Sequence, residues 1–226
     1  LRSELSFIHS ETTLPVKVTL PGPMTVADST ADEFYHNEEK LAMDVAVALN
    51  EEALELEKQG AAVIQFDEPV FSRYPEKVVN WGIKALDRCL EGLTTAKSTA
   101  HICYSYPMPG VPRPIVDSYP VILEALEFSK VDELALEFEA SKLDPSLLRR
   151  CPSKTVLFGC IDNGTNDIEN PRDIAKKLLA AAEHLPPTQI QAAPDCGLVP
   201  LPLDIARLKL KAMVGGAKLA RQEFGN

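Results

Sequence analysis

Short runs of apolar residues alternate with longer segments of helical periodicity along most of the chain. Six runs are rich in Val, Ile, Leu, Ala and Phe and are bounded by Gly, Pro, Asp or Ser, which predicts buried strands. The predicted strands cover residues 15–20, 62–66, 98–104, 131–138, 155–161 and 189–193.

The segments between these strands carry apolar residues at helical spacing. Residues 38–59, for example, place Leu41, Val45 and Leu49 on one face, and Gly60 ends the segment. The predicted helices cover residues 1–10, 38–59, 75–90, 121–128, 170–185 and 203–224, with a brief one that starts at 144. Residues 105–120 are rich in proline, and we expect them to form a lid or a binding loop.

This alternation of strands and helices predicts parallel βαβ units and an α/β fold class. A (β/α)8 TIM barrel needs eight such units, and the chain supplies six, so we expect a TIM barrel that lacks its first two βα units within this chain. An open doubly wound sheet is the alternative, but the Gly-rich phosphate fingerprint that often accompanies it is absent. The chain begins at Leu1 without a methionine, and we interpret residues 1–226 as one domain, the C-terminal three quarters of a barrel.

Composition narrows the function classes. The 226 residues carry a formal net charge of −10, which argues against nucleic acid or an anionic membrane as a partner. No apolar run reaches the roughly 18 residues that a membrane span needs, and the start of the chain lacks a signal-peptide pattern. Five unevenly spaced cysteines do not indicate a disulfide framework, so we expect a cytoplasmic protein with free or metal-bound thiols.

His101 and Cys103 form an H-x-C pair near the end of the predicted strand 98–104. Side chains two residues apart point to the same side of a strand. Imidazole and thiolate ligands suit zinc, and Cys196 would add a second thiolate from a separate element. The pair is equally compatible with two half-buried core residues, so H-x-C alone does not establish a metal site.

Further ligand-type and acid-base residues follow the ends of the predicted strands, where the functional residues of a (β/α)8 barrel lie. They are Asp67, Glu68, Glu137, Glu139, Asp162 and Asp195. An unpaired buried carboxylate costs on the order of several kcal/mol, so acidic residues inside a buried strand indicate a neutralising cation. The alternative is that they are solvated loop carboxylates.

Three motifs at these strand ends resemble the catalytic C-terminal barrel of cobalamin-independent methionine synthases. The chain also resembles shorter single-barrel relatives in the superfamily that includes uroporphyrinogen decarboxylase. The motifs are Ile64-Gln65-Phe66-Asp67-Glu68-Pro69, His101-Ile102-Cys103-Tyr104 and Pro194-Asp195-Cys196-Gly197-Leu198. The resemblance runs from Val16 to the last predicted helix and implies a zinc-dependent methyltransferase.

The resemblance also implies roles for individual residues. The implied zinc ligands are His101, Cys103, Glu137 and Cys196, with Glu139 as the rival carboxylate. Asp67 is implied to be catalytic and to bind the amino group of homocysteine, with Glu68 beside it in substrate binding, although Asp67 could also be a helix-capping or loop carboxylate. Zinc would stabilise the substrate as a thiolate at neutral pH, and its sulfur would attack a methyl carbon in line.

Two segments depart from the family pattern. Where the family has a D-I-H-S segment with a proton-donating histidine, this chain has Asp162-Asn163-Gly164-Thr165. The tryptophan that stacks on folate after the family's G-P-x-T motif is missing after Gly22-Pro23-Met24-Thr25. The resemblance therefore covers the thiol-activating half of the site better than the methylfolate-binding half.

We expect zinc-dependent methyl transfer to the thiol of homocysteine, giving methionine, with methylfolate or a methylcorrinoid as donor. One alternative is a zinc-dependent alkyltransferase that acts on another thiol or uses another electrophile, and a second is a non-catalytic zinc-binding barrel. The expected partners are a small-molecule thiol and a methyl donor, with no nucleic acid and no membrane. Either a homo-oligomer or an additional N-terminal segment is expected to complete the molecule.

Overall fold

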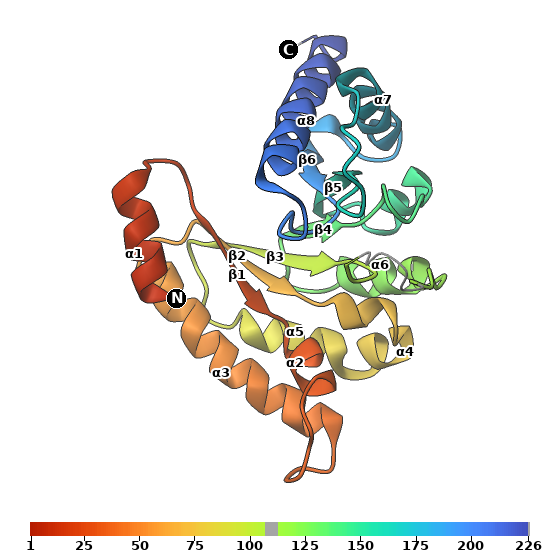
Figure 1. Cartoon of the computed structure of the whole chain (residues 1–226). Helices are drawn as coiled ribbons and strands as arrows, with labels where there is room; N and C mark the ends of the chain where they lie inside the picture. The colour runs from red at the N-terminus through yellow and green to blue at the C-terminus, as the bar shows by residue number, and fades with distance from the viewer. Residues whose placement is uncertain (107–112, 226) are drawn as a thin grey trace.

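The computed structural model describes residues 1–106 and 113–225 and has a single sheet of six parallel strands (Figure 1). The strands pair in sequence order, so β1 and β6 are the two edges of the sheet. Their bounds are β1 Lys17–Pro21, β2 Val63–Asp67, β3 Lys97–Ile102, β4 Glu133–Leu136, β5 Thr155–Ile161 and β6 Ile190–Pro194. The prediction of six parallel strands in an α/β fold is confirmed.

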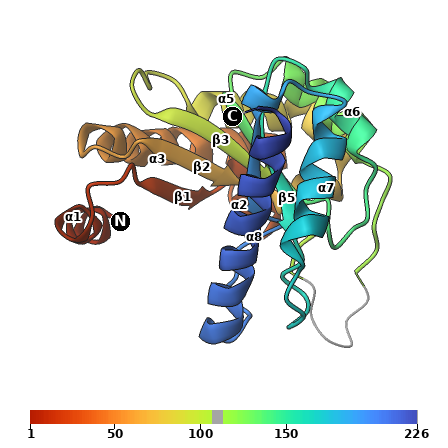
Figure 2. The same ribbon diagram turned by 90° about the horizontal axis from the view of Figure 1, so that it is seen from above.

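The helices cover the outer side of this sheet, and each lies near the strands that it connects (Figure 1). Helix α3 packs against α5 below the first strands (Figure 1), and α7 and α8, which contact β5 and β6, lie side by side (Figure 2). The main helices are α1 Arg2–Glu11, α3 Glu38–Lys58, α5 Ile83–Cys89, α6 Tyr119–Glu127, α7 Pro171–Ala182 and α8 Leu203–Glu223. Among the described residues, no helix is long and apolar enough to cross a membrane.

The two faces of the central strands differ sharply in polarity. Ile64 and Phe66 of β2 are fully buried against the helices, as are the alternate residues of β3, β4 and β5. The inner face instead carries Gln65, Thr99 and Glu133, which are paired in register across β2, β3 and β4. Because the outer face supplies the apolar core, the inner face is free to carry polar chemistry toward the carboxyl ends of the strands.

One helix was not predicted, and the helix predicted over 75–90 is confirmed but is irregular. Helix α2, Pro23–Asp28, occupies a segment where Pro21-Gly22-Pro23 predicted only the end of a strand. The single helix predicted over 75–90 is instead divided into α4 Pro75–Lys77, a π-helical turn Val78–Gly82 and α5. Gly82 lies in this turn, where an added Cβ would lie 3.1 Å from Met24 Sδ, so the turn brings the backbone close to α2.

The remaining short elements follow their local sequence signals. Asp144 accepts a hydrogen bond from the backbone N–H of Ser146 and begins the predicted short helix, which is a 3-10 helix over Pro145–Arg150. Helix α6 begins at Tyr119, so Pro120 belongs to its first turn and not to the predicted loop 105–120. Residues 107–112 of that loop lie outside the described residues, so its role as a lid or binding loop stays a prediction.

Candidate metal and substrate site

His101, Cys103 and Cys196 converge at the carboxyl ends of the strands. One ligand atom from each residue lies within 4.8 Å of the other two, and the two sulfur atoms are 4.0 Å apart. His101 is on β3, Cys103 follows directly after it, and Cys196 is in the loop after β6. The structure therefore brings together three of the four residues that the sequence indicated as metal ligands.

The imidazole of His101 is oriented for coordination. Its Nδ1 lies 3.1 Å from the carbonyl oxygen of Ala135, which can only accept, so Nδ1 carries the proton. The lone pair is then on Nε2, which is buried and has no hydrogen-bond partner among the described residues. A histidine that ligates a metal usually donates its other ring N–H to a carbonyl or carboxylate in this way.

The two thiols share one proton. The Cys103 thiol donates a hydrogen bond to the sulfur of Cys196, and this contact, together with the nearby His101, lowers the pKa of Cys196 to about 4 although burial opposes it. The same contact and burial raise the pKa of Cys103 well above its usual value. A thiolate, a thiol and an unpartnered imidazole nitrogen form a donor set that fits zinc.

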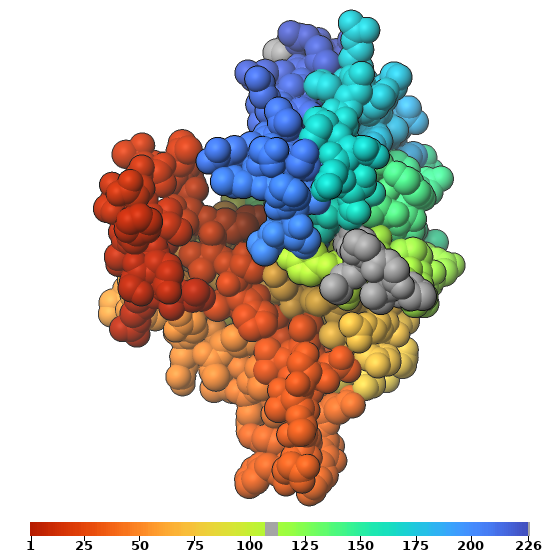
Figure 3. Space-filling model, viewed as in Figure 1, coloured from red at the N-terminus to blue at the C-terminus, as the bar shows by residue number. Residues whose placement is uncertain are grey.

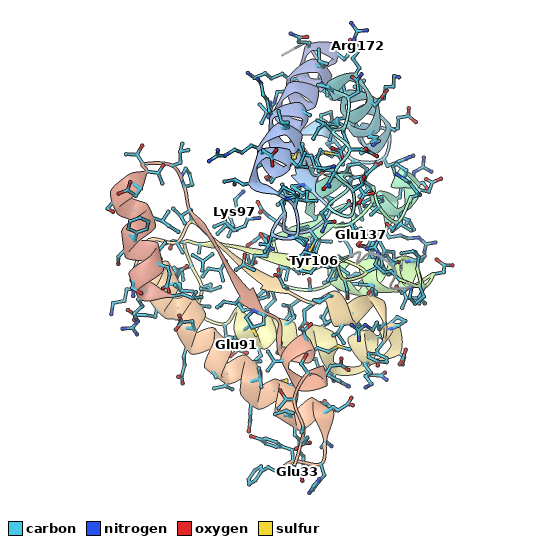
Figure 4. The ribbon with its side chains drawn as sticks, in the orientation of Figure 1. Glu33, Glu91, Lys97, Tyr106, Glu137 and Arg172 are labelled. Atoms are coloured by element: carbon cyan, nitrogen blue, oxygen red, sulfur yellow. The ribbon has the colours of Figure 1, made fainter. Side chains whose placement is uncertain are left out.

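Glu137 lies beside this group, but it is not one of the three converging ligands. Its carboxylate is 1% exposed, and Oε2 accepts hydrogen bonds from the backbone N–H of Tyr104 and from Arg113 Nη1, both at 2.9 Å. Arg113 Nη1 also lies 2.8 Å from Oε1, without the geometry of a hydrogen bond, and Oε1 is buried without another partner among the described residues. Figure 4 shows Glu137 near Tyr106 at the ends of the central strands. Its role as a zinc ligand stays a prediction.

Glu139, the rival carboxylate, lies beyond the end of β4. Strand β4 ends at Leu136, so the alternation of a strand does not extend to Glu139. The Glu139 carboxylate pairs with Lys142 and Lys177, which lower its pKa even though burial opposes them. Glu137 is therefore the better placed of the two carboxylates.

Asp195 holds the Cys196 loop against the end of β4. Its buried carboxylate accepts hydrogen bonds from the backbone N–H groups of Phe138, Glu139 and Ala140 at 2.6 to 3.0 Å. Burial raises the pKa of Asp195 to about 7 despite these three donors. Among the described residues, the hydrogen bonds of the Asp195 carboxylate are with the backbone that follows Glu137 and with none of the side chains that converge at the thiols.

Asp67 lies next to His101 on the inner face of the sheet. The two residues are paired in register between β2 and β3, and paired residues in a parallel sheet point to the same side. The Asp67 side chain is half-buried, and burial raises its pKa against the opposing effect of His101. A carboxylate here can receive a cationic group of a ligand held at the thiols.

Glu68 points away from this face and serves the start of α2. It is completely buried and accepts hydrogen bonds from the backbone N–H groups of Met24 and Thr25 and from the Thr25 hydroxyl. Complete burial raises the pKa of Glu68 to about 7. The structure does not bring Glu68 to the thiols, and its predicted contact with substrate stays untested.

Several neighbours of the site were missed by sequence reasoning. Arg113 pairs with Glu137, the Ser72 hydroxyl donates to the carbonyl of Cys103, and the Tyr106 hydroxyl would lie 2.9 Å from a Cβ at Gly197. Burial and the nearby Cys196 raise the pKa of Tyr106 to about 12. In Figure 3 the blue C-terminal part of the chain borders yellow-green residues from the middle of the chain. The only sequence feature that could have indicated one of these contacts is the position of Arg113 in the proline-rich residues 105–120.

A buried lysine of α8 anchors the loop after β5. Lys209 is fully buried and donates hydrogen bonds to the carbonyls of Asp162 and Asp167 and to the Glu169 carboxylate. Asn163 is also buried, and its Nδ2 donates to the carbonyl of Gly197 at 3.4 Å. The segment where the family has its histidine thus supports the Cys196 loop, and sequence reasoning missed Lys209.

The chain is similar in sequence to known proteins. Residues 4–219 match the family model described as the catalytic domain of cobalamin-independent synthase. The methionine synthase of Thermococcus kodakarensis is 32% identical over 223 residues, which are 98% of this chain and 62% of that protein. The methionine synthase of Sulfurisphaera tokodaii is 31% identical over 211 residues, which are 93% of this chain and 58% of that protein.

A solved structure is similar over almost the whole chain. The B12-independent methionine synthase from Shewanella sp. W3-18-1, in complex with selenomethionine, superposes with a TM-score of 0.92 at 35% identity. The match covers 99% of this chain and 67% of that chain. The chain spans about 60% of the length of the two curated relatives.

Proposed function

Because the chain belongs to the family of cobalamin-independent methionine synthase catalytic domains, we propose that it transfers a methyl group to the thiol of homocysteine, giving methionine. The single observation that carries this proposal is the convergence of His101, Cys103 and Cys196, with the His101 Nε2 buried and unpartnered among the described residues. The similar Shewanella enzyme is in complex with selenomethionine, which supports a site that accepts a methionine-like product.

We propose that His101, Cys103 and Cys196 hold zinc, with Glu137 as the fourth protein ligand. The donor set fits zinc because it combines soft sulfur with an imidazole nitrogen that is already oriented. When bound, zinc would lower the pKa of a substrate thiol so that its sulfur is a nucleophile at neutral pH. When Glu137 is not a ligand, its carboxylate would pair with Arg113, as it does in this structure.

The residues of the chain would orient the substrate. Asp67, on the same face as His101, would bind the α-ammonium group of homocysteine and so aim its sulfur at the thiol end of the site. The sulfur loses its proton and gains the methyl carbon, and the donor keeps the electron pair of the broken bond. The missing tryptophan after Thr25 and the glycine at position 164 favour a donor other than polyglutamylated methylfolate, such as a methylcorrinoid.

We further propose that two βα units close the barrel between β1 and β6. Both strands are sheet edges in the described chain, and an apolar groove of about 790 Å³ runs along β6, α7 and α8. The groove includes Ile190, Met213 and Phe224, which in a closed barrel would pack on the next unit. The two curated relatives exceed this chain by enough residues for two such units. The units that close this barrel would belong either to the same polypeptide or to another.

The proposed reaction is tested by incubating the zinc-loaded protein with homocysteine and either methyltetrahydrofolate or methylcobalamin. We expect methionine to form with at least one donor and its formation to be lost in Cys103→Ser. Alkylation of other thiols at the same rate would favour a thiol alkyltransferase of broader specificity. Zinc binding with no methionine from either donor would contradict the proposal.

A further inference from the structure

Gln65 links two charged residues on the inner face of the sheet. Its Oε1 lies 3.2 Å from Lys17 Nζ on β1, and its Nε2 lies 2.8 Å from Asp67 Oδ1 two residues along β2. Residues two apart on a strand share a face, so Gln65 lies next to Asp67 and one layer below the thiols. Gln65 is not one of the residues that converge on the thiols.

The orientation of the Gln65 amide is fixed by its neighbours. A lysine ammonium group can only donate hydrogen bonds, so it requires the amide oxygen. The amide NH2 must then face Asp67, whose ionised carboxylate can only accept. Lys17 and Asp67 therefore require the same orientation of the amide.

This contact occupies one oxygen of Asp67 and leaves the other available. Within residues 1–106 and 113–225, Gln65 is the sole hydrogen-bond donor to the Asp67 carboxylate. Gln65 also keeps Lys17 away from Asp67, since the ammonium group is held on the far end of the amide. Without this spacer, Lys17 could reach Asp67 and occupy the carboxylate that a substrate ammonium group requires.

We propose that Gln65 is a positioning residue that orients Asp67 and screens it from Lys17, so that the site prefers thiols that carry an α-ammonium group. The inference rests on the proposed function, in which Asp67 receives the amino group of homocysteine. It assigns the selectivity for an amino-acid thiol to a residue that touches neither the thiol nor the metal ligands.

The test compares two thiols on the zinc-loaded protein by calorimetric binding. Homocysteine and 4-mercaptobutanoate have the same thiol and carboxylate, but only homocysteine has the amino group. We expect Gln65→Met to raise the Kd for homocysteine about tenfold, the effect of losing one well-made hydrogen bond to a charged group, and to leave the Kd for 4-mercaptobutanoate unchanged. Lys17→Met, at an exposed position, should reduce the preference less, because the amide keeps its hydrogen bond to Asp67 and loses only the second partner on its oxygen.

Gln191→Met is the matched control. Gln191 is also an inner-face amide, but its Nε2 lies 3.5 Å from Glu133 and makes no contact with Asp67, so the preference should be unchanged. A double Lys17→Met/Gln65→Met variant should recover part of the preference, because the competing ammonium group is gone. Zinc content of each variant establishes that the site is intact.

The outcomes separate the two proposals. A Gln65→Met protein that keeps the wild-type preference, or that loses affinity for both thiols equally, would overturn the positioning role alone. A wild-type protein that binds homocysteine no more tightly than 4-mercaptobutanoate would overturn the proposed substrate as well.

Discussion

The sulfur atoms of Cys103 and Cys196 lie 4.0 Å apart although 93 residues separate them in the sequence. We predict that the purified protein binds one zinc ion per chain and that a Cys103→Ala/Cys196→Ala variant binds none, because two of the soft ligands are removed. Metal analysis after dialysis measures this. Cys151→Ala is the control, since Cys151 is buried beside Leu148 in the core and should not affect zinc. Full zinc retention in the double variant would rule out the site.

In the proposed zinc site, Arg113 would compete with the metal for Glu137. Its guanidinium lies within 2.9 Å of both carboxylate oxygens, so zinc coordination by Glu137 must weaken this pair. We predict that Arg113→Met tightens zinc binding about tenfold, both because Glu137 is released and because a positive charge next to the ion is removed. Competition with a chromogenic chelator measures the Kd. Arg73→Met, which removes a contact to Asp28 instead, should have no effect, and weaker zinc binding in Arg113→Met would contradict the proposed role of Glu137.

Asp67 should affect substrate binding and not the metal. We predict that Asp67→Asn weakens homocysteine binding about 30-fold, because a hydrogen bond between two charged groups is lost, while zinc content stays at the wild-type level. Calorimetry and metal analysis on the same sample distinguish the two effects. Asp162→Asn, at the end of β5, is the control, because the Asp162 carboxylate accepts from the backbone of Gly164. Loss of zinc equal to that in the cysteine variant would exclude a role confined to substrate binding.

Glu68 should make stability depend on pH. Complete burial raises its pKa in the folded protein to about 7, from 4.5, so the folded state holds a proton that the unfolded state releases between these two values. The free energy of unfolding should therefore fall as the pH rises from about 4.5 to 7, by up to about 3 kcal/mol from this group alone. Urea unfolding at pH 5 and pH 7 measures the difference.

The Glu68→Gln variant should lose the share of this pH dependence that Glu68 contributes, since glutamine does not titrate, and should keep the share of Asp195, whose pKa burial also raises to about 7. Glu57→Gln is the matched control: Glu57 also accepts backbone N–H groups, from Thr94, Thr95 and Ala96, but these donors lower its pKa although burial opposes them. The same slope in wild type and Glu68→Gln would show that another group causes it.

The strands could be predicted because their signals are local. The apolar run at 155–161 predicts β5 with the bounds that the structure shows, and His101 and Cys103 fall where the third run ends. Helix α2 could not be predicted in this way. Its N-terminus is stabilised by the carboxylate of Glu68, which is 44 residues from Met24 in the sequence.

The same limit applies to the site. The motifs at positions 101–104 and 194–198 identify three converging ligands, because each motif places its residue at a strand end. The partners of the acidic residues depend on how loops run in space. Arg113 pairs with Glu137, and Glu139 pairs with Lys142 and Lys177. The spacing of these residues in the sequence does not predict either contact.

The unpaired edges of the sheet have a consequence for handling the protein. Where no further unit pairs with them, the N–H and C=O groups along the outer sides of β1 and β6, edges of the sheet in the part of the chain that the structure describes, can recruit strands from neighbouring molecules, which is how exposed edges start aggregation. Lys17 and Pro21 on β1 and Pro194 on β6 oppose this, since a lysine charge and a proline without an N–H both disfavour extension of a ladder. The tendency of the protein to aggregate in concentrated solution should therefore depend on ionic strength, because salt screens the Lys17 charge that disfavours pairing at β1.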